Sequence, residues 1–132
     1  MTTYEAVLAA YDVAIPEHLA AEAEIPVLTG AQRQGDVIVL PMRPGRVNGL
    51  EPIPAPGVAV VRGENGGNTH LLVGAGRWAA RPDGQDLGTL VVGDGEVAYL
   101  LHPEHSGQGI GPGSYRLRRQ REQADKIRLV AD

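Results

Sequence analysis

The sequence predicts a mainly β fold, a small barrel or roll of roughly six to eight short antiparallel strands preceded by an N-terminal helical arm. The 132 residues fit one domain. They include 18 Gly and 10 Pro, which favours many turns and few long helices. Short runs of Val, Ile and Leu between these turn residues are typical of strands. We therefore divide the chain into an arm at residues 1–30 and a β-barrel or β-roll domain at residues 31–132.

The arm is expected to form one bent helix or two short helices over residues 3–25. Thr2 and Glu5 form a capping box at its start. Pro16 interrupts the helical pattern, and Pro26 ends it. Apolar side chains recur at helical spacing and define one face of the arm. They are Tyr4, Val7, Leu8, Tyr11 and Ile15.

The strands are expected to begin with a run of buried type over residues 36–40. Residues 41–57 are so rich in Pro and Gly that we predict a loop there. An Asn-Gly turn within residues 65–68 predicts a hairpin between strands at 58–62 and 69–73.

A second hairpin is predicted around Asp94-Gly95, because this dipeptide suits a type I′ turn. Its strands would run over residues 87–92 and 96–102. An arginine-rich strand follows over residues 114–121, and a last short strand is expected at 127–130.

The composition limits the kinds of functional site that the chain can form and the cellular compartments in which it is expected. The chain has no Cys, which excludes disulfides, thiolate nucleophiles and Cys-based metal sites. Residues 1–32 carry five acidic side chains and no Lys or Arg, so they lack the positive region of a signal peptide. No apolar run approaches the roughly 20 residues that cross a bilayer. We therefore expect a cytoplasmic protein that is not inserted in a membrane.

Charge is placed unevenly along the chain. Six of the twelve basic residues lie in the final 17 positions. Such asymmetry is typical of a nucleic-acid surface. It equally suits two chain ends that attract each other, within one subunit or between two.

The stretch His102-Pro-Glu-His105 places two imidazoles and a carboxylate at the end of a predicted strand. Zinc, iron and manganese use these ligand types in a protein without Cys. His70, at the start of another strand, would add a third imidazole. The candidate metal ligands are therefore His70, His102, Glu104 and His105. The alternative is that the histidines hydrogen-bond in turns and pair with Glu104.

The arginine-rich strand alternates between an apolar and a basic face. Tyr115 and Leu117 are expected to face the core. The basic face and the strand end form a candidate nucleic-acid surface. Its residues are Arg116, Arg118, Gln120 and Arg121.

Arg119 and Arg121 fall on the apolar side of this strand by the same alternation. An inward arginine needs a carboxylate partner, because an unpaired buried charge is costly. The expected partners are Glu104, Asp125 and Asp132.

The stretch from His102 to Asp132 resembles a group of uncharacterised bacterial proteins. Their pattern runs His-x-Glu-His, Pro-Gly-x-Tyr and Gln-Arg-Glu-Tyr, and the present sequence has these groups at residues 102–105, 112–115 and 120–123. Gln123 stands where the pattern has its last Tyr. The resemblance covers residues 35–132, and it implies a shared β fold but no activity, cofactor or partner.

The histidines also resemble, more remotely, those of the cupins, which are metal-binding β-barrels. In the cupin pattern, Asn68 and Tyr115 occupy positions of histidine ligands.

These observations favour a non-catalytic binding or self-association module that needs no cofactor. A protein partner or a second copy would contact the arm and the loop at 41–57. The first alternative is a metal-dependent, cupin-like enzyme that holds zinc or iron through the histidines. The second alternative is a nucleic-acid binder that uses the basic C-terminal strand.

Overall fold

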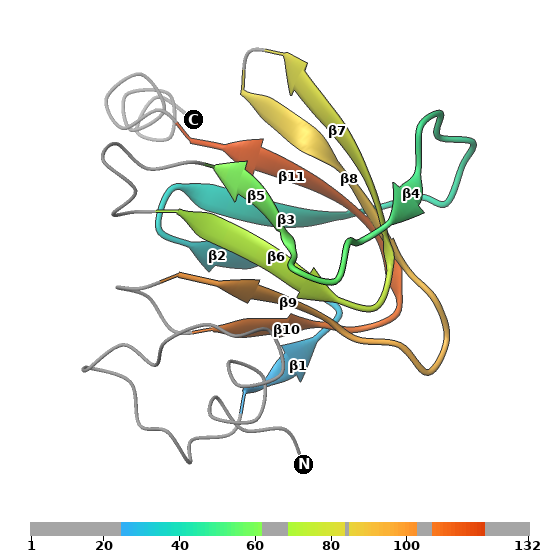
Figure 1. Ribbon diagram of the computed structural model, residues 1–132, viewed down its shortest axis with the longest axis horizontal. Coiled ribbons are helices and arrows are strands. Elements are labelled where there is room, and N and C mark those ends of the chain that lie inside the picture. The colour runs from blue at the N-terminus through green and yellow to red at the C-terminus, as the bar shows by residue number, and fades with distance from the viewer. Residues whose placement is uncertain (1–24, 62–68, 84, 103–106, 121–132) are drawn as a thin grey trace.

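The computed structural model describes residues 25–61, 69–83, 85–102 and 107–120. These residues form eleven strands in two sheets that pack face to face (Figure 1). The five-stranded sheet has the order β1-β10-β9-β6-β5, and the six-stranded sheet has the order β2-β3-β11-β8-β7-β4. The strands are β1 (Val27–Leu28), β2 (Gln32–Gln34), β3 (Val37–Met42), β4 (Glu51–Pro52), β5 (Val58–Val61), β6 (His70–Gly74), β7 (Arg77–Asp83), β8 (Asp86–Val92), β9 (Ala98–Leu101), β10 (Gln108–Ile110) and β11 (Gly113–Arg119).

The prediction of a mainly β fold is confirmed. Of the two architectures predicted, a barrel or a roll, the barrel is wrong, because neither sheet closes. Each sheet keeps two edges, which are β1 and β5 in one sheet and β2 and β4 in the other. The strands are more numerous than expected, and β1 pairs with β10 in parallel.

The predicted helical arm lies outside the described residues as far as residue 24, and so does the predicted strand at 127–130. The last residues assigned to the arm include β1, which joins the five-stranded sheet. The described part of the chain contains no helix, and therefore none long and apolar enough to cross a membrane.

The core lies between the two sheets. Leu72 and Leu100 from the five-stranded sheet and Leu90, Tyr115 and Leu117 from the six-stranded sheet belong to one buried cluster. The prediction that Tyr115 and Leu117 face the core is confirmed. Burial on alternate positions of β2, β3 and β11 is the pattern that favours strands over helices.

The turns sort to two ends of the sandwich. The hairpins β2–β3, β5–β6, β7–β8 and β9–β10 all turn at one end, which we call the hairpin end. The connections β6–β7, β8–β9 and β10–β11 cross between the sheets at the opposite end, which we call the crossover end (Figure 1).

The predicted hairpin around Asp94-Gly95 is wrong. The strand before it, β8, pairs with β7 and β11, whereas the strand after it, β9, pairs with β6 and β10 in the other sheet. The turn itself forms, since the Glu96 amide donates to the Gly93 carbonyl at 3.1 Å and Gly95 has a φ of 75°. The residues between Val92 and Ala98 are enough to reach a sheet about 10 Å away, so the turn becomes a corner between layers.

Glutamines close the side of the sandwich between β2 and the five-stranded sheet. Gln32 donates to the Gly109 carbonyl at 3.1 Å, and Gln34 donates to the Leu100 carbonyl at 2.9 Å. Gln108 donates in the other direction, to the Arg33 carbonyl. These bonds satisfy buried amides and tie the edge strand β2 to the opposite sheet.

Candidate functional site

The structure brings together two of the predicted metal ligands. His70 begins β6 and His102 directly follows β9, and both are buried. Their ring centroids lie 4.3 Å apart with 42° between the ring planes. Glu104 and His105 lie outside the described residues. Among the residues that the structure describes, no group of three His, Asp or Glu side chains is placed to hold a metal.

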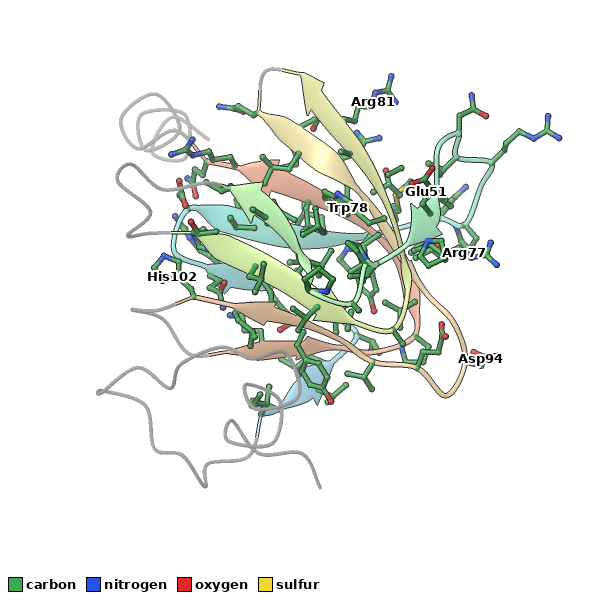
Figure 2. The ribbon with its side chains drawn as sticks, in the orientation of Figure 1. Glu51, Arg77, Trp78, Arg81, Asp94 and His102 are labelled. Atoms are coloured by element: carbon green, nitrogen blue, oxygen red, sulfur yellow. The ribbon has the colours of Figure 1, made fainter. Side chains whose placement is uncertain are left out.

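Both histidines lie at the hairpin end, where Figure 2 labels His102. Asp36 reaches His70 from the two-residue turn between β2 and β3. Gly35 precedes it with a φ of 58°, a conformation that glycine adopts without strain. This tight turn holds the Asp36 carboxylate between the two sheets.

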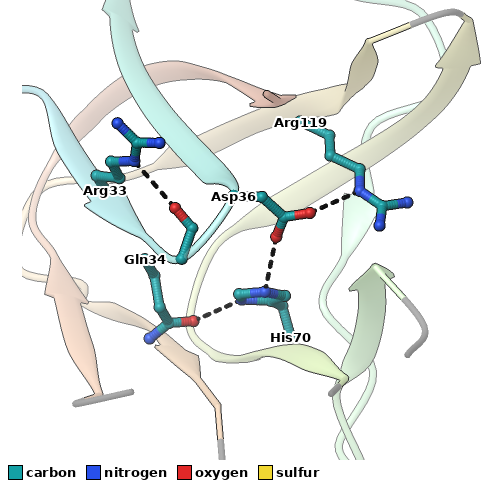
Figure 3. Close-up of polar contacts among 6 residues, drawn as sticks. Arg33, Gln34, Asp36, His70 and Arg119 are labelled. Atoms are coloured by element: carbon teal, nitrogen blue, oxygen red, sulfur yellow. Dashed lines mark hydrogen bonds and ion pairs between the residues drawn. The ribbon is translucent and has the colours of Figure 1, made fainter. Parts of the chain in front are cut away.

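The His70 ring is held on both of its nitrogens (Figure 3). Its Nδ1 lies 2.9 Å from Gln34 Oε1, and its Nε2 lies 3.2 Å from Asp36 Oδ1. The other oxygen of the carboxylate, Asp36 Oδ2, accepts a hydrogen bond from Arg119 Nε at 2.7 Å. We call Gln34, Asp36, His70, His102 and Arg119 the hairpin-end cluster.

Two acceptor oxygens of the chain face the nitrogens of the His70 ring. The amide of Gln34 is oriented by its Nε2, which donates to Leu100, so its Oε1 faces the ring as an acceptor. An unprotonated Nε2 would point a lone pair at a carboxylate oxygen. In this arrangement both ring nitrogens are directed at acceptor oxygens, Nδ1 at the amide of Gln34 and Nε2 at the carboxylate of Asp36.

The Asp36 carboxyl is ionised in this environment. Burial raises its pKa, but the hydrogen bond from Arg119, the charge of Arg119, a hydrogen bond from its own backbone and the charge of His70 lower it by more. The net effect holds the pKa of Asp36 below its ordinary value. The Arg119 guanidinium and the His70 ring thus share one carboxylate at the hairpin end.

This geometry favours the alternative in which the histidines make hydrogen bonds. A metal ligand must offer a lone pair on one ring nitrogen, and His70 directs both nitrogens at acceptors of the chain. Binding a metal through His70 would require the ring to leave Gln34 or Asp36.

The prediction that Arg119 pairs with Glu104, Asp125 or Asp132 is wrong. Its partner is Asp36, and its side chain is 55% exposed rather than buried. Sequence reasoning assigned Asp36 only to a strand. A signal was available, because Gly35-Asp36 between two β-type runs suits a two-residue hairpin turn, which would have placed this carboxylate at a strand end.

The predicted basic surface is divided in the structure. Arg116 is exposed, but Arg118 lies 3.1 Å from Asp86 Oδ1 and donates to Gln85 at 3.2 Å. The backbone amide of Gln120 donates to the Asp36 carbonyl at 2.7 Å. Arg121 lies outside the described residues.

A second group of candidate residues lies at the crossover end. The loop at residues 43–50 joins β3 to β4 and projects beyond the sheets (Figure 1). Arg43 and Arg46 on this loop are exposed. Exposed Arg77 and Glu51 lie at its base, on the paired strands β7 and β4 (Figure 2).

A family model described as a domain of unknown function (DUF8820) matches residues 33–120 of the 132. The chain belongs to the DUF8820 family. No curated protein and no solved structure matches it. The expectation of an uncharacterised family is confirmed at this level, whereas the motif pattern of the bacterial group and the cupin resemblance stay predictions.

The DUF8820 match includes the complete hairpin-end cluster and the loop at 43–50. It excludes residues 1–32 and Arg121. The two candidate sites therefore lie within the DUF8820 match, and residues 1–32 lie outside it.

Proposed function

We propose that this DUF8820 chain is a non-catalytic binding module, and that its loop at residues 43–50 contacts an acidic segment of a partner protein. The observation that carries the proposal is a basic loop that is anchored at both ends and stands clear of the sheets between them. Binding residues are often found on loops that a rigid scaffold positions in this way.

The loop is fixed where it returns to the sandwich. Glu51 and Pro52 pair with β7, and the Ile53 amide donates to the Gly76 carbonyl at 3.1 Å. Its middle is open, since a Cβ added at Gly45 or Gly49 would meet no atom within 4 Å. A partner can therefore approach this part of the loop without displacing the sheets.

The side chains of the loop suit an acidic and partly apolar segment. Arg43 and Arg46 are exposed, and Arg77 lies beside the anchored end. A guanidinium group can donate two parallel hydrogen bonds to one carboxylate. Val47 and Leu50 are partly exposed and offer apolar contact between the charges.

The hairpin-end cluster supports a non-catalytic role. A general base needs an unprotonated nitrogen near a substrate. His70 instead directs both nitrogens at Gln34 and Asp36, and its side chain is only 3% exposed.

A protein partner is favoured over a nucleic acid because of the outer face of the six-stranded sheet. Arg118 on that face is engaged by Asp86 and Gln85. The described residues of the face include no aromatic side chain on which bases could stack, since Trp78 and Tyr115 point into the core.

The test compares two fluorescent probes by anisotropy at low and physiological salt. One is a peptide that alternates Glu with apolar residues, and the other is a single-stranded DNA of equal charge. We expect the peptide to bind, and the double variant Arg43→Glu/Arg46→Glu to weaken it about tenfold or more. Arg81→Glu, an exposed arginine on β7 outside the loop, is the matched control and should leave the affinity unchanged.

Two outcomes contradict the proposal. Equal weakening by the double variant and by Arg81→Glu would indicate attraction by net charge alone. Tighter binding of the DNA, lost on Arg116→Glu, would instead support the nucleic-acid alternative.

A further inference from the structure

The five-stranded sheet carries apolar side chains on both of its faces. Leu72 and Leu100 point into the core. The alternate positions, which point outward, hold Leu71 and Val73 on β6 and Tyr99 and Leu101 on β9. A sheet with one face in water alternates apolar and polar residues, whereas a sheet covered on both faces has continuous apolar runs like these.

Two outward side chains are already buried. Val73 is 0% exposed and Leu101 is 6% exposed, yet neither belongs to the core cluster between the sheets. Gly57 approaches Val73 so closely that a Cβ there would lie 2.7 Å from Val73 Cγ1. Toward the edge of the same face, Val27 on β1 is 44% exposed. The outer face is therefore a packing surface.

The outer face of the six-stranded sheet is different. Arg116 and Arg118 stand on its central strand, and Arg33 and Arg77 stand on outlying strands. These charged side chains are typical of a face in contact with water. Half-buried Ile38, Leu40 and Val91 also point outward on this face, so it is mixed, whereas the outward positions of β6 and β9 carry no charge. The outer face of the five-stranded sheet is therefore the better place for a third layer.

We propose that residues 1–24 form this third layer within the same chain, with their apolar stripe packed on the outer face of the five-stranded sheet. The stripe consists of Tyr4, Val7, Leu8, Tyr11 and Ile15. Its counterpart on the sheet consists of Leu71, Tyr99 and Leu101, with Val27 at the edge.

The point where the segment ends supports this placement. The described chain begins at Ile25, which is 4% exposed, and β1 follows at the edge of this very sheet. The Gly109 and Gly111 amides donate to the Pro26 and Leu28 carbonyls, each at 2.9 Å, so this entry is fastened to β10.

The dimensions also match. A helix over residues 3–15 would be about 20 Å long. Five strands spaced by about 4.8 Å are about 19 Å across. The remaining residues before Ile25 are enough to turn the chain back to β1.

The distribution of charge indicates which of the two outer sheet faces the segment contacts. Residues 1–24 carry five acidic side chains and no Lys or Arg, and the outward positions of β6 and β9 carry no charge. The rival destination is the arginine-bearing face of the other sheet. Burial of five apolar side chains contributes more than ion pairs in water, so the apolar face is the stronger site.

Paramagnetic relaxation in the full-length protein tests the proposal. The chain has no Cys, so Ala9→Cys, placed off the apolar stripe, accepts a single nitroxide. We expect the amide signals of Leu71 and Tyr99 to lose most of their intensity, while those of Leu40 and Arg116 in the other sheet are kept. Adding Leu8→Asp should restore the lost signals, and Ala6→Asp on the opposite side of the helix should not.

Three outcomes overturn the proposal. The first is preferential loss at Leu40 and Arg116, which places the segment on the arginine-bearing face. The second is signal loss in a mixture in which the isotope-labelled chains carry no nitroxide and the other chains do. This result would assign the layer to a second copy. The third is no loss at either sheet.

Discussion

Removing the charge of Asp36 should destabilise the fold without changing its shape. Asn has nearly the same volume as Asp but cannot pair with two cations. We expect Asp36→Asn to lower the free energy of unfolding at pH 7 by about 2–3 kcal/mol.

The magnitude follows from the exposure of the two partners. The His70 side chain is 3% exposed, and a hydrogen bond from a charged group contributes about 1.5–3 kcal/mol. The Arg119 side chain is 55% exposed, so its pair adds only about 0–1 kcal/mol. The cost of about 3–5 kcal/mol for breaking a fully buried pair is not reached, because Asp36 is itself 31% exposed and water relieves part of it.

Chemical denaturation followed by fluorescence measures this effect, since Trp78 is the single Trp and lies in the core. A loss of about 2–3 kcal/mol corresponds to a fall in Tm of roughly 8–12 °C for a domain of this size. Asp94→Asn, an exposed carboxylate in the turn before β9, is the matched control and should change stability by less than about 0.5 kcal/mol.

The pH dependence separates charge from packing. The folded pKa of Asp36 is lowered, so its contribution is complete above the unfolded pKa of about 3.9 and is lost as the pH falls through the folded pKa. The difference between wild type and Asp36→Asn should therefore be full at pH 7 and shrink below about pH 4. A difference that is the same at pH 7 and pH 3 would refute the reasoning, because the cost would then arise from packing alone.

Three further substitutions test other contacts of the fold. Arg119→Gln should cost less than about 1 kcal/mol, and a larger loss would mean that this exposed arginine is held more tightly than its accessibility indicates. Tyr115→Phe should cost about 1 kcal/mol in denaturation experiments, because the hydroxyl donates to a backbone carbonyl at 2.8 Å; an unchanged stability would contradict this. Gly109→Ala should expose the amides between β1 and β10 to hydrogen exchange, because the new Cβ would lie 2.8 Å from the Pro26 carbonyl oxygen. Gly45→Ala, which meets open space, is its control, and equal exchange in both variants would count against the close approach.

Local patterns in the sequence predicted the strands well. The runs predicted at 36–40, 58–62, 69–73 and 114–121 correspond to β3, β5, β6 and β11 to within two residues at each end. Each run reflects the burial of alternate side chains, a property that a strand carries by itself.

Pairing between strands could not be predicted in the same way. Asp94-Gly95 specifies a turn whether the next strand stays in the same sheet or crosses to the other one. The choice depends on which neighbours bury β8 and β9, and these neighbours are distant in sequence. The parallel pair of β1 and β10 depends on the glycines of β10, whose role is visible only when Pro26 lies against them.

The contacts within the candidate site could not be predicted from the sequence either. The sequence indicated His70 and His102, but their 4.3 Å contact depends on the register between β6 and β9. Asp36 and Arg119 are 83 positions apart, and the hydrogen bond between them follows from the pairing of β3 with β11.

The hairpin-end cluster has a structural role beside an aliphatic core, because it fixes how the two sheets are aligned. Val, Leu and Ile are similar enough that contacts between them tolerate small shifts of one layer against the other. Asp36 lies on the six-stranded sheet and contacts Arg119 of that sheet and His70 of the other, so one placement of the layers satisfies all three side chains. Closure of a barrel would fix the alignment of the two sheets, but the sandwich is open at the edge strand β2. The contact between Asp36 and His70 at the hairpin end supplies this constraint instead. Holding this register engages both nitrogens of the His70 ring with Gln34 and Asp36, which explains why a candidate metal ligand of the sequence is bound within the fold instead.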